Sequence, residues 1–162
     1  CNLTGIDLTK IKSISGATFK GANLEGANLQ GVNTTEYSQD PIFTSACLRN
    51  ANLAYTELIG VLFDNANLES ANLSYSEIRE SDFSNANLSH AIIIDADLSG
   101  AEFANANLSD SDLSRSDLRD ANFKNADLSG ANLHQIKFNK NTKWQKAIGL
   151  ENARNIPEEW RK

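Results

Sequence analysis

The feature that most constrains this chain is a five-residue repeat that runs without a break from Thr44 to Phe138. Each copy reads small residue, Asn or Asp, Leu or Phe, and two polar residues, as in Ala66-Asn67-Leu68-Glu69-Ser70. A period of five matches neither an α-helix, with about 3.6 residues per turn, nor a strand, whose side chains alternate every two residues. The repeat therefore predicts a coil built from short sides.

A second period of twenty residues lies on top of the first, because Phe recurs at every fourth copy. These residues are Phe43, Phe63, Phe83, Phe103 and Phe123. Twenty residues are four sets of five, so the simplest account is an all-β coil with four sides and Phe on one side of every turn. The Leu or Phe of each copy, and the small residue two positions before it, should point inward. Coils about 4.8 Å apart would then stack as about seven turns of a solenoid.

The register is interrupted once, and the pattern stops before the C-terminus. We expect the insertion 35–41 to be a loop at one corner that leaves the coil intact, and the coil to span 1–140. Residues 141–162 are predicted to form a helical cap over the apolar end of the solenoid. Thr142 and Gln145 have the spacing of a capping box that opens a helix, and Gly149 is a typical helix end.

Charge and composition narrow the classes of function. Residues 1–136 hold 18 acidic and 8 basic side chains, a net of −10, whereas 137–162 hold 3 acidic and 7 basic ones, a net of +4. An acidic body does not favour nucleic-acid binding. No apolar run is long enough to cross a bilayer, so we expect no membrane span in this segment. The sequence contains no Met, which suggests a fragment or a processed form. The compartment stays open: cytoplasm, or periplasm or thylakoid lumen if a signal has been removed.

No arrangement of reactive side chains points to catalysis or to a bound group. The two cysteines, Cys1 and Cys47, form no C-x-x-C pair. The two histidines, His90 and His134, fall at outward positions about two coils apart, where neither has a nucleophile to activate. We therefore predict that the protein is not an enzyme and has no catalytic residue, metal site or cofactor.

Over about residues 1–140, the Ala-(Asp/Asn)-Leu-x-x pattern resembles the pentapeptide repeat family. This resemblance implies a right-handed quadrilateral β-helix. The abundance of Ala, Asn and Leu is similar to cyanobacterial and plastid members. The gyrase-protecting members, which favour Cys and Phe and dimerise through a C-terminal module, are less similar. Through them the resemblance also implies an alternative function, a DNA mimic that binds topoisomerase.

Three outward features break the uniformity of the repeats and are candidates for an interaction surface. An acidic column places one carboxylate per coil at the same position of one side: Glu57, Glu77, Asp97 and Asp117. It either aids solubility or attracts a cation or a basic partner, and Arg79 and Arg119 partly neutralise it. A Tyr/Ile zone comprises Tyr37, Tyr55, Tyr75, Ile92 and Ile94. The third feature is the loop 35–41, since loops often carry function.

The sequence thus predicts a non-enzymatic scaffold or protein–protein interaction module. We expect a protein partner of unknown identity, no nucleic acid, and a monomer or weak oligomer.

Overall fold

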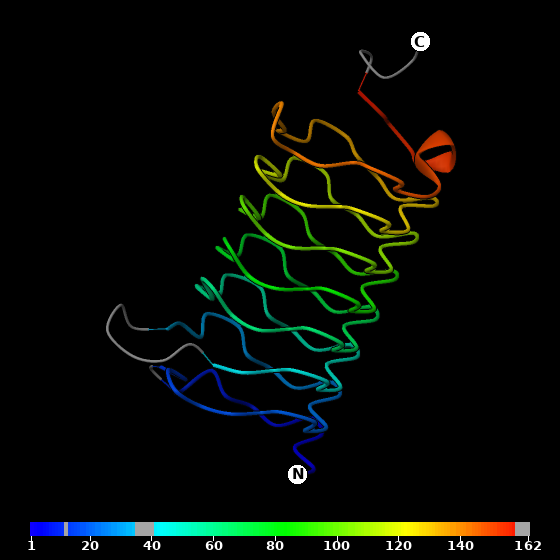
Figure 1. Cartoon of the computed structure of the whole chain (residues 1–162). Helices are drawn as coiled ribbons and strands as arrows, with labels where there is room; N and C mark the ends of the chain where they lie inside the picture. Colours follow the sequence, from blue (N-terminus) through cyan, green and yellow to red (C-terminus); the bar gives the residue numbers. More distant parts are fainter. Residues whose placement is uncertain (12, 35–40, 158–162) are drawn as a thin grey trace.

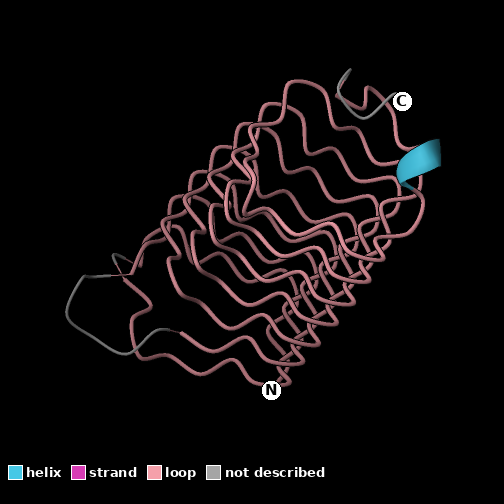
Figure 2. Ribbon diagram, turned by 45° about the horizontal axis from the view of Figure 1, so that its top comes forward, coloured by secondary structure: helices cyan, strands magenta, loops and turns pink. Residues whose placement is uncertain are grey.

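The computed structural model describes residues 1–11, 13–34 and 41–157, which wind into a rod of stacked coils with the N-terminus at one end and the last described residues at the other (Figure 1). The residue before most inward Leu, Ile or Phe side chains forms a parallel β-bridge with its counterpart in the next coil, as Asn67 does with Asn87 and Asn87 with Asn107. Within the described ranges, the only helix is the 3-10 turn η1, Leu150–Asn152 (Figure 2). The prediction of an all-β coil is confirmed.

The five-residue unit forms one side and one corner because its positions differ in backbone conformation and hydrogen bonding. In the copy that contains Asn67, the side-chain oxygen of this residue accepts a hydrogen bond from the backbone N–H of Glu69 at 3.1 Å, which shapes the corner. The next residue, Ser70, has a left-handed φ of 58°. Its N–H donates to Ser89 of the following coil at 2.9 Å. Asn, Asp, Ser and Gly suit this position because they tolerate, or relieve the strain of, a left-handed backbone.

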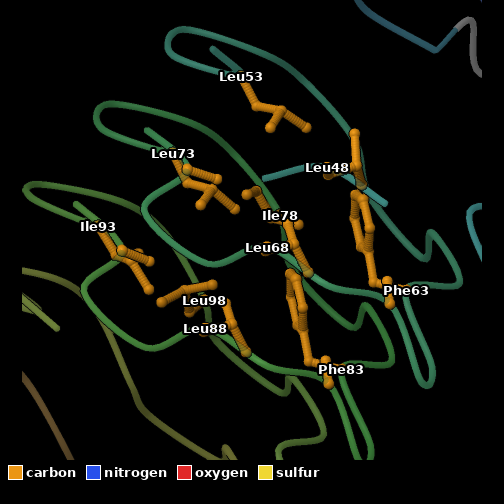
Figure 3. Close-up of a cluster of buried hydrophobic side chains, with 14 of the residues drawn as sticks. Leu48, Leu53, Phe63, Leu68, Leu73, Ile78, Phe83, Leu88, Ile93 and Leu98 are labelled. Atoms are coloured by element: carbon orange, nitrogen blue, oxygen red, sulfur yellow. The ribbon is translucent and has the colours of Figure 1, made fainter. Parts of the chain in front are cut away.

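The inward positions form one continuous core, as the sequence predicted. The side chains of Leu68 and Phe83 are completely buried, and Figure 3 shows Phe63 and Phe83 one above the other, with Leu and Ile on the remaining sides. Rings of successive coils are parallel: the Phe63 and Phe83 centroids lie 4.8 Å apart, with an interplanar angle of 4°. Since each coil covers the next, burial proceeds along the rod as in other solenoids.

The insertion before Pro41 leaves the register intact. The bridge between Thr18 and Ile42 spans more of the sequence than the regular bridge between Asn67 and Asn87, yet it pairs the same positions of two successive coils. The ring of Phe19 stacks on Phe43 at 4.8 Å, which confirms that the Phe column crosses the insertion. Pro41 is buried at the inward small position. The predicted loop itself lies, but for Pro41, outside the described residues.

The predicted helix from Thr142 to Gly149 is wrong, because the coil continues through it. Lys143 forms a bridge with Asn122, and further bridges join Ile148 to Asp127 and Arg154 to Asn132. Trp144 takes the next place in the Phe column, with its ring centroid 4.6 Å from Phe123 and an interplanar angle of 6°. The physical reason is that pairing with the coil below satisfies the backbone and covers Phe123, which outweighs a local helix signal.

The remainder of the cap is also largely non-helical in the part that the structure describes. Only η1 follows Gly149, whose φ is 74°, and residues 153–157 contain a bridge and a turn but no helix. Trp160 lies outside the described residues. The described chain has no helix long and apolar enough to cross a bilayer.

Candidate interaction surface

The acidic column and the Tyr/Ile zone meet at one corner of the rod. Tyr55 occupies the left-handed corner position, and Glu57, two residues later, starts the acidic column on the adjoining side. β-Bridges join Glu57 to Glu77, Glu77 to Asp97 and Asp97 to Asp117, so the four carboxylates follow one another along the rod as the sequence predicted. Two features that the sequence suggested separately are therefore neighbours.

Arginines neutralise most of the acidic column. The guanidinium of Arg79 lies 3.3 Å from the carboxylate of Glu77 and 3.7 Å from that of Asp97. Arg119 donates two hydrogen bonds to Asp117, from Nε at 2.9 Å and from Nη2 at 2.6 Å. The hydrogen bond from Arg119 lowers the pKa of Asp117, although partial burial opposes it. Neutralisation by Arg79 and Arg119, expected from the sequence, is thus present.

One carboxylate of the column is different. Within residues 1–11, 13–34 and 41–157, Glu57 has no Lys or Arg nitrogen within 4.0 Å, whereas the other three members of the column each have one. Glu57 is also exposed to solvent. The negative charge that a partner could reach is therefore concentrated at the end of the column nearest the N-terminus.

The tyrosine pair, Tyr55 and Tyr75, forms a stack on the outside of the rod. The ring centroids lie 5.0 Å apart and the planes differ by 7°, yet the two residues remain 58% and 49% exposed. Both have left-handed φ values, 60° and 59°, which bulky residues seldom adopt. Two large side chains at strained and exposed positions contribute little to the core, and they are good candidates for contact with a partner.

The corner changes character further along the rod. Asp95 and Arg115 occupy the same left-handed position in the next two coils, and Arg115 donates to Asp95 from Nε at 2.9 Å and from Nη2 at 2.6 Å. This hydrogen bond lowers the pKa of Asp95. The twenty-residue period places Asp95 and Arg115 one above the other, so this pair could have been predicted from the sequence, but it was missed.

The remaining residues that were predicted for the interaction surface differ in how exposed they are. Ile92 is 44% exposed and follows Asn72 in the outward ladder. Ile94 is only half-buried at the corner, and its carbonyl accepts the N–H of Tyr75 at 2.9 Å. Tyr37 lies outside the described residues. Sequence reasoning did not select three further exposed apolar side chains, namely Ile11, Leu62 and Ile148. An apolar residue at an outward position was the available signal for Leu62, whereas counting in fives from Phe138 gives Ile148 an inward position.

The described residues include no cluster of three or more His, Cys, Asp or Glu side chains that could hold a metal ion. His90 and His134 lie exposed on different corners.

Several solved structures of pentapeptide repeat proteins are similar to this chain. HetL from Nostoc sp. strain PCC 7120, involved in heterocyst differentiation regulation, is 22% identical, with 96% of this chain and 90% of HetL covered and a TM-score of 0.42. A protein from the Arabidopsis thaliana thylakoid lumen is 29% identical. The match covers 63% of this chain and 65% of the Arabidopsis chain, with a TM-score of 0.46. QnrB1, a plasmid-mediated fluoroquinolone resistance protein, is 21% identical. The match covers 86% of this chain and 78% of QnrB1, with a TM-score of 0.43.

These TM-scores are all below 0.5, so the assignment rests on the repeat itself. No curated protein matched the chain. The sequence profile for pentapeptide repeats matches 8 copies, over residues 13–33, 46–85, 81–120 and 106–140. This covers more than half of the sequence, and the chain belongs to the pentapeptide repeat family.

Proposed function

We propose that this protein is a non-enzymatic interaction module that binds a protein partner through the corner formed by Tyr55, Tyr75 and Glu57. The observation that carries the proposal is the exposed tyrosine stack, because two aromatic rings are held outward beside carboxylates. Tyrosines that combine an apolar ring with a polar tip are enriched where proteins bind one another. The right-handed, four-sided coil of about seven turns would act as the rigid support.

A binding experiment with matched variants tests this proposal. The double variant Tyr55→Asn/Tyr75→Asn removes both rings while keeping a residue type that tolerates a left-handed φ, as Asn65 does in the same fold. Leu62→Asn is the control, because it removes an apolar side chain that is 39% exposed on a different side. We expect a partner captured by wild-type protein to be lost with the double variant and kept with the control. Equal capture by all three proteins would refute the proposal.

A topoisomerase-directed DNA mimic is the second candidate, favoured by the column of carboxylates. Duplex DNA carries one negative charge per about 1.7 Å along its axis. Here Arg79 and Arg119 pair with members of the column, so the face carries positive as well as negative charge. Mimicry predicts inhibition of DNA supercoiling by a type II topoisomerase at micromolar protein. An absence of inhibition at that concentration would exclude this candidate.

The interaction module needs no self-association. We expect a monomer or a weak oligomer, which sedimentation velocity over a hundredfold range of concentration would measure.

A further inference from the structure

The tyrosine stack ends abruptly on one side. Tyr75 covers one face of the Tyr55 ring at a centroid distance of 5.0 Å. The residue at the same corner in the preceding coil is Gly31, whose N–H donates to Ala54 at 3.0 Å and which has no side chain. A Cβ built on Gly31 would meet no atom of the described residues within 4 Å. Among the described residues, therefore, no side chain at this corner of the preceding coil covers the second face of Tyr55, and the space around Gly31 is open.

The height of that open space along the rod matches the spacing at which planar groups stack. Coils are spaced like neighbouring strands, at about 4.8 Å, and the rings of this protein stack at 4.6 to 5.1 Å when a residue fills each level. A planar group at the level of Gly31 would lie on Tyr55 as Tyr55 lies on Tyr75. The backbone would not obstruct it, because Gly31 presents only hydrogen at this corner.

The charge on the Tyr55 side of this space is the negative one of Glu57, whereas Lys10 takes the same corner one coil beyond Gly31. Glu57 follows Tyr55 by two residues, is exposed, and has no basic partner within the described residues. Its neighbour on the side nearer the N-terminus is the uncharged Asn33, to which it is bridged. A cation that stacked on Tyr55 could pair with Glu57 directly, because no arginine of the described residues is already paired with this carboxylate.

Among protein side chains, the planar group that keeps its positive charge at neutral pH is the guanidinium of arginine. It stacks on aromatic faces, loses little hydration energy, and can donate two parallel hydrogen bonds to a carboxylate. The protein already uses that two-bond geometry twice, between Arg115 and Asp95 and between Arg119 and Asp117. A lysine ammonium is compact and more strongly hydrated, so it would fill the slot less well.

We propose that the bare face of Tyr55, the open level at Gly31 and the carboxylate of Glu57 form a binding site for an arginine side chain in an exposed segment of a protein partner. The proposal rests on the proposed function and specifies which residue of the partner is recognised. The stack orients the guanidinium plane, Glu57 supplies the charge, and Gly31 keeps the level empty.

The test follows the ring signals of the tyrosines by NMR, in protein with ¹³C-labelled Tyr, during titration with N-acetyl-arginine methylamide. The variant Tyr55→Asn identifies the signals of Tyr55. We expect saturable shifts at Tyr55, with binding about two- to fivefold weaker for the corresponding lysine compound. Equal shifts with the two compounds would overturn the role of a planar cation.

Two variants with matched controls test the geometry. Gly31→Tyr places a third ring on the stack at a corner that already carries left-handed tyrosines, and should abolish the response of Tyr55. Glu57→Gln should weaken binding about two- to fivefold, whereas Glu77→Gln should leave it unchanged. Persistence of wild-type binding in Gly31→Tyr would refute the site, provided that the circular dichroism spectrum shows an intact fold.

The same measurements separate this inference from the broader function. A partner that depends on the tyrosine pair, together with no response to the arginine probe, would overturn the arginine site and leave the interaction module standing. A response to the probe that vanishes in Gly31→Tyr, with no partner lost in the double variant, would establish the site and refute the proposed function.

Discussion

Replacing Phe83 by Ala is the most direct test of the packed column. The Phe83 ring is completely buried and lies between Phe63, at 4.8 Å, and Phe103, at 5.0 Å. Truncation removes a large apolar side chain and opens a cavity that the stacked rings on both sides cannot close without moving their coils. Both effects are included in the usual cost of a buried Phe→Ala change, so we expect the free energy of unfolding to fall by roughly 3–5 kcal/mol.

Urea denaturation followed by far-UV circular dichroism measures this cost. Phe83→Leu is the matched control, because Leu already occupies inward positions on the other sides, as Leu88 does in the same coil. It keeps an apolar side chain in the column and should cost about 1.5 kcal/mol or less. A cost below about 1 kcal/mol for Phe83→Ala would show that the column is not tightly packed, and the account of the core would be wrong.

Other predictions concern the outside of the rod and its C-terminal end. Glu77→Gln should change the free energy of unfolding by less than about 0.5 kcal/mol, since exposed ion pairs contribute little and relief of like-charge repulsion offsets the loss; a urea melt measures it. Gly149→Ala should destabilise more than Gly100→Ala in thermal melts. Both residues have left-handed φ values, but a Cβ on Gly149 would lie 2.5 Å from the Cα of Ser129 whereas one on Gly100 would find ordinary contact distances; equal losses would contradict this. The pKa of Asp117 is lowered in the folded state. It therefore stabilises the fold above its unfolded pKa, about 3.9, and this stabilisation should disappear as the pH falls through the folded pKa. Asp117→Asn should show a smaller loss of stability below about pH 4, measured as the midpoint of urea unfolding against pH.

Most of the fold could be predicted from the sequence because the twenty-residue period places the same inward and outward positions in every coil. The inward direction of Leu68 and Phe83 and the alignment of Glu57 with Glu77 follow from counting. Counting failed at Trp144, because the regular period after Phe123 leads to Lys143 instead. One extra residue before Trp144 shifted it out of the twenty-residue count, so it was not recognised as a member of the Phe column. A local capping-box pattern then favoured a helix. Stacking on an existing ring is a long-range contact that such a local pattern does not contain.

The candidate surface was only partly predictable for a related reason. The period placed Tyr55 above Tyr75, and it placed Glu57 above Glu77, but it treated the two pairs as separate features. Their proximity depends on which corner adjoins which side. The bare face of Tyr55 depends on Gly31, a residue whose significance is the side chain that it lacks. A corner glycine is ordinary in this repeat, so nothing in the local sequence marks it.

The tolerance of the bridges to extra residues has a consequence for protein design. Thr18 pairs with Ile42 and Asn122 with Lys143 across more of the sequence than a regular coil contains, yet both pairs form the same parallel bridge as the regular pairs. The bridges thus persist when the sequence between two sides is longer than usual. The rod can therefore serve as a display scaffold: peptides grafted at different corners would project at fixed heights along its axis, with spacing set by the coil and composition chosen freely.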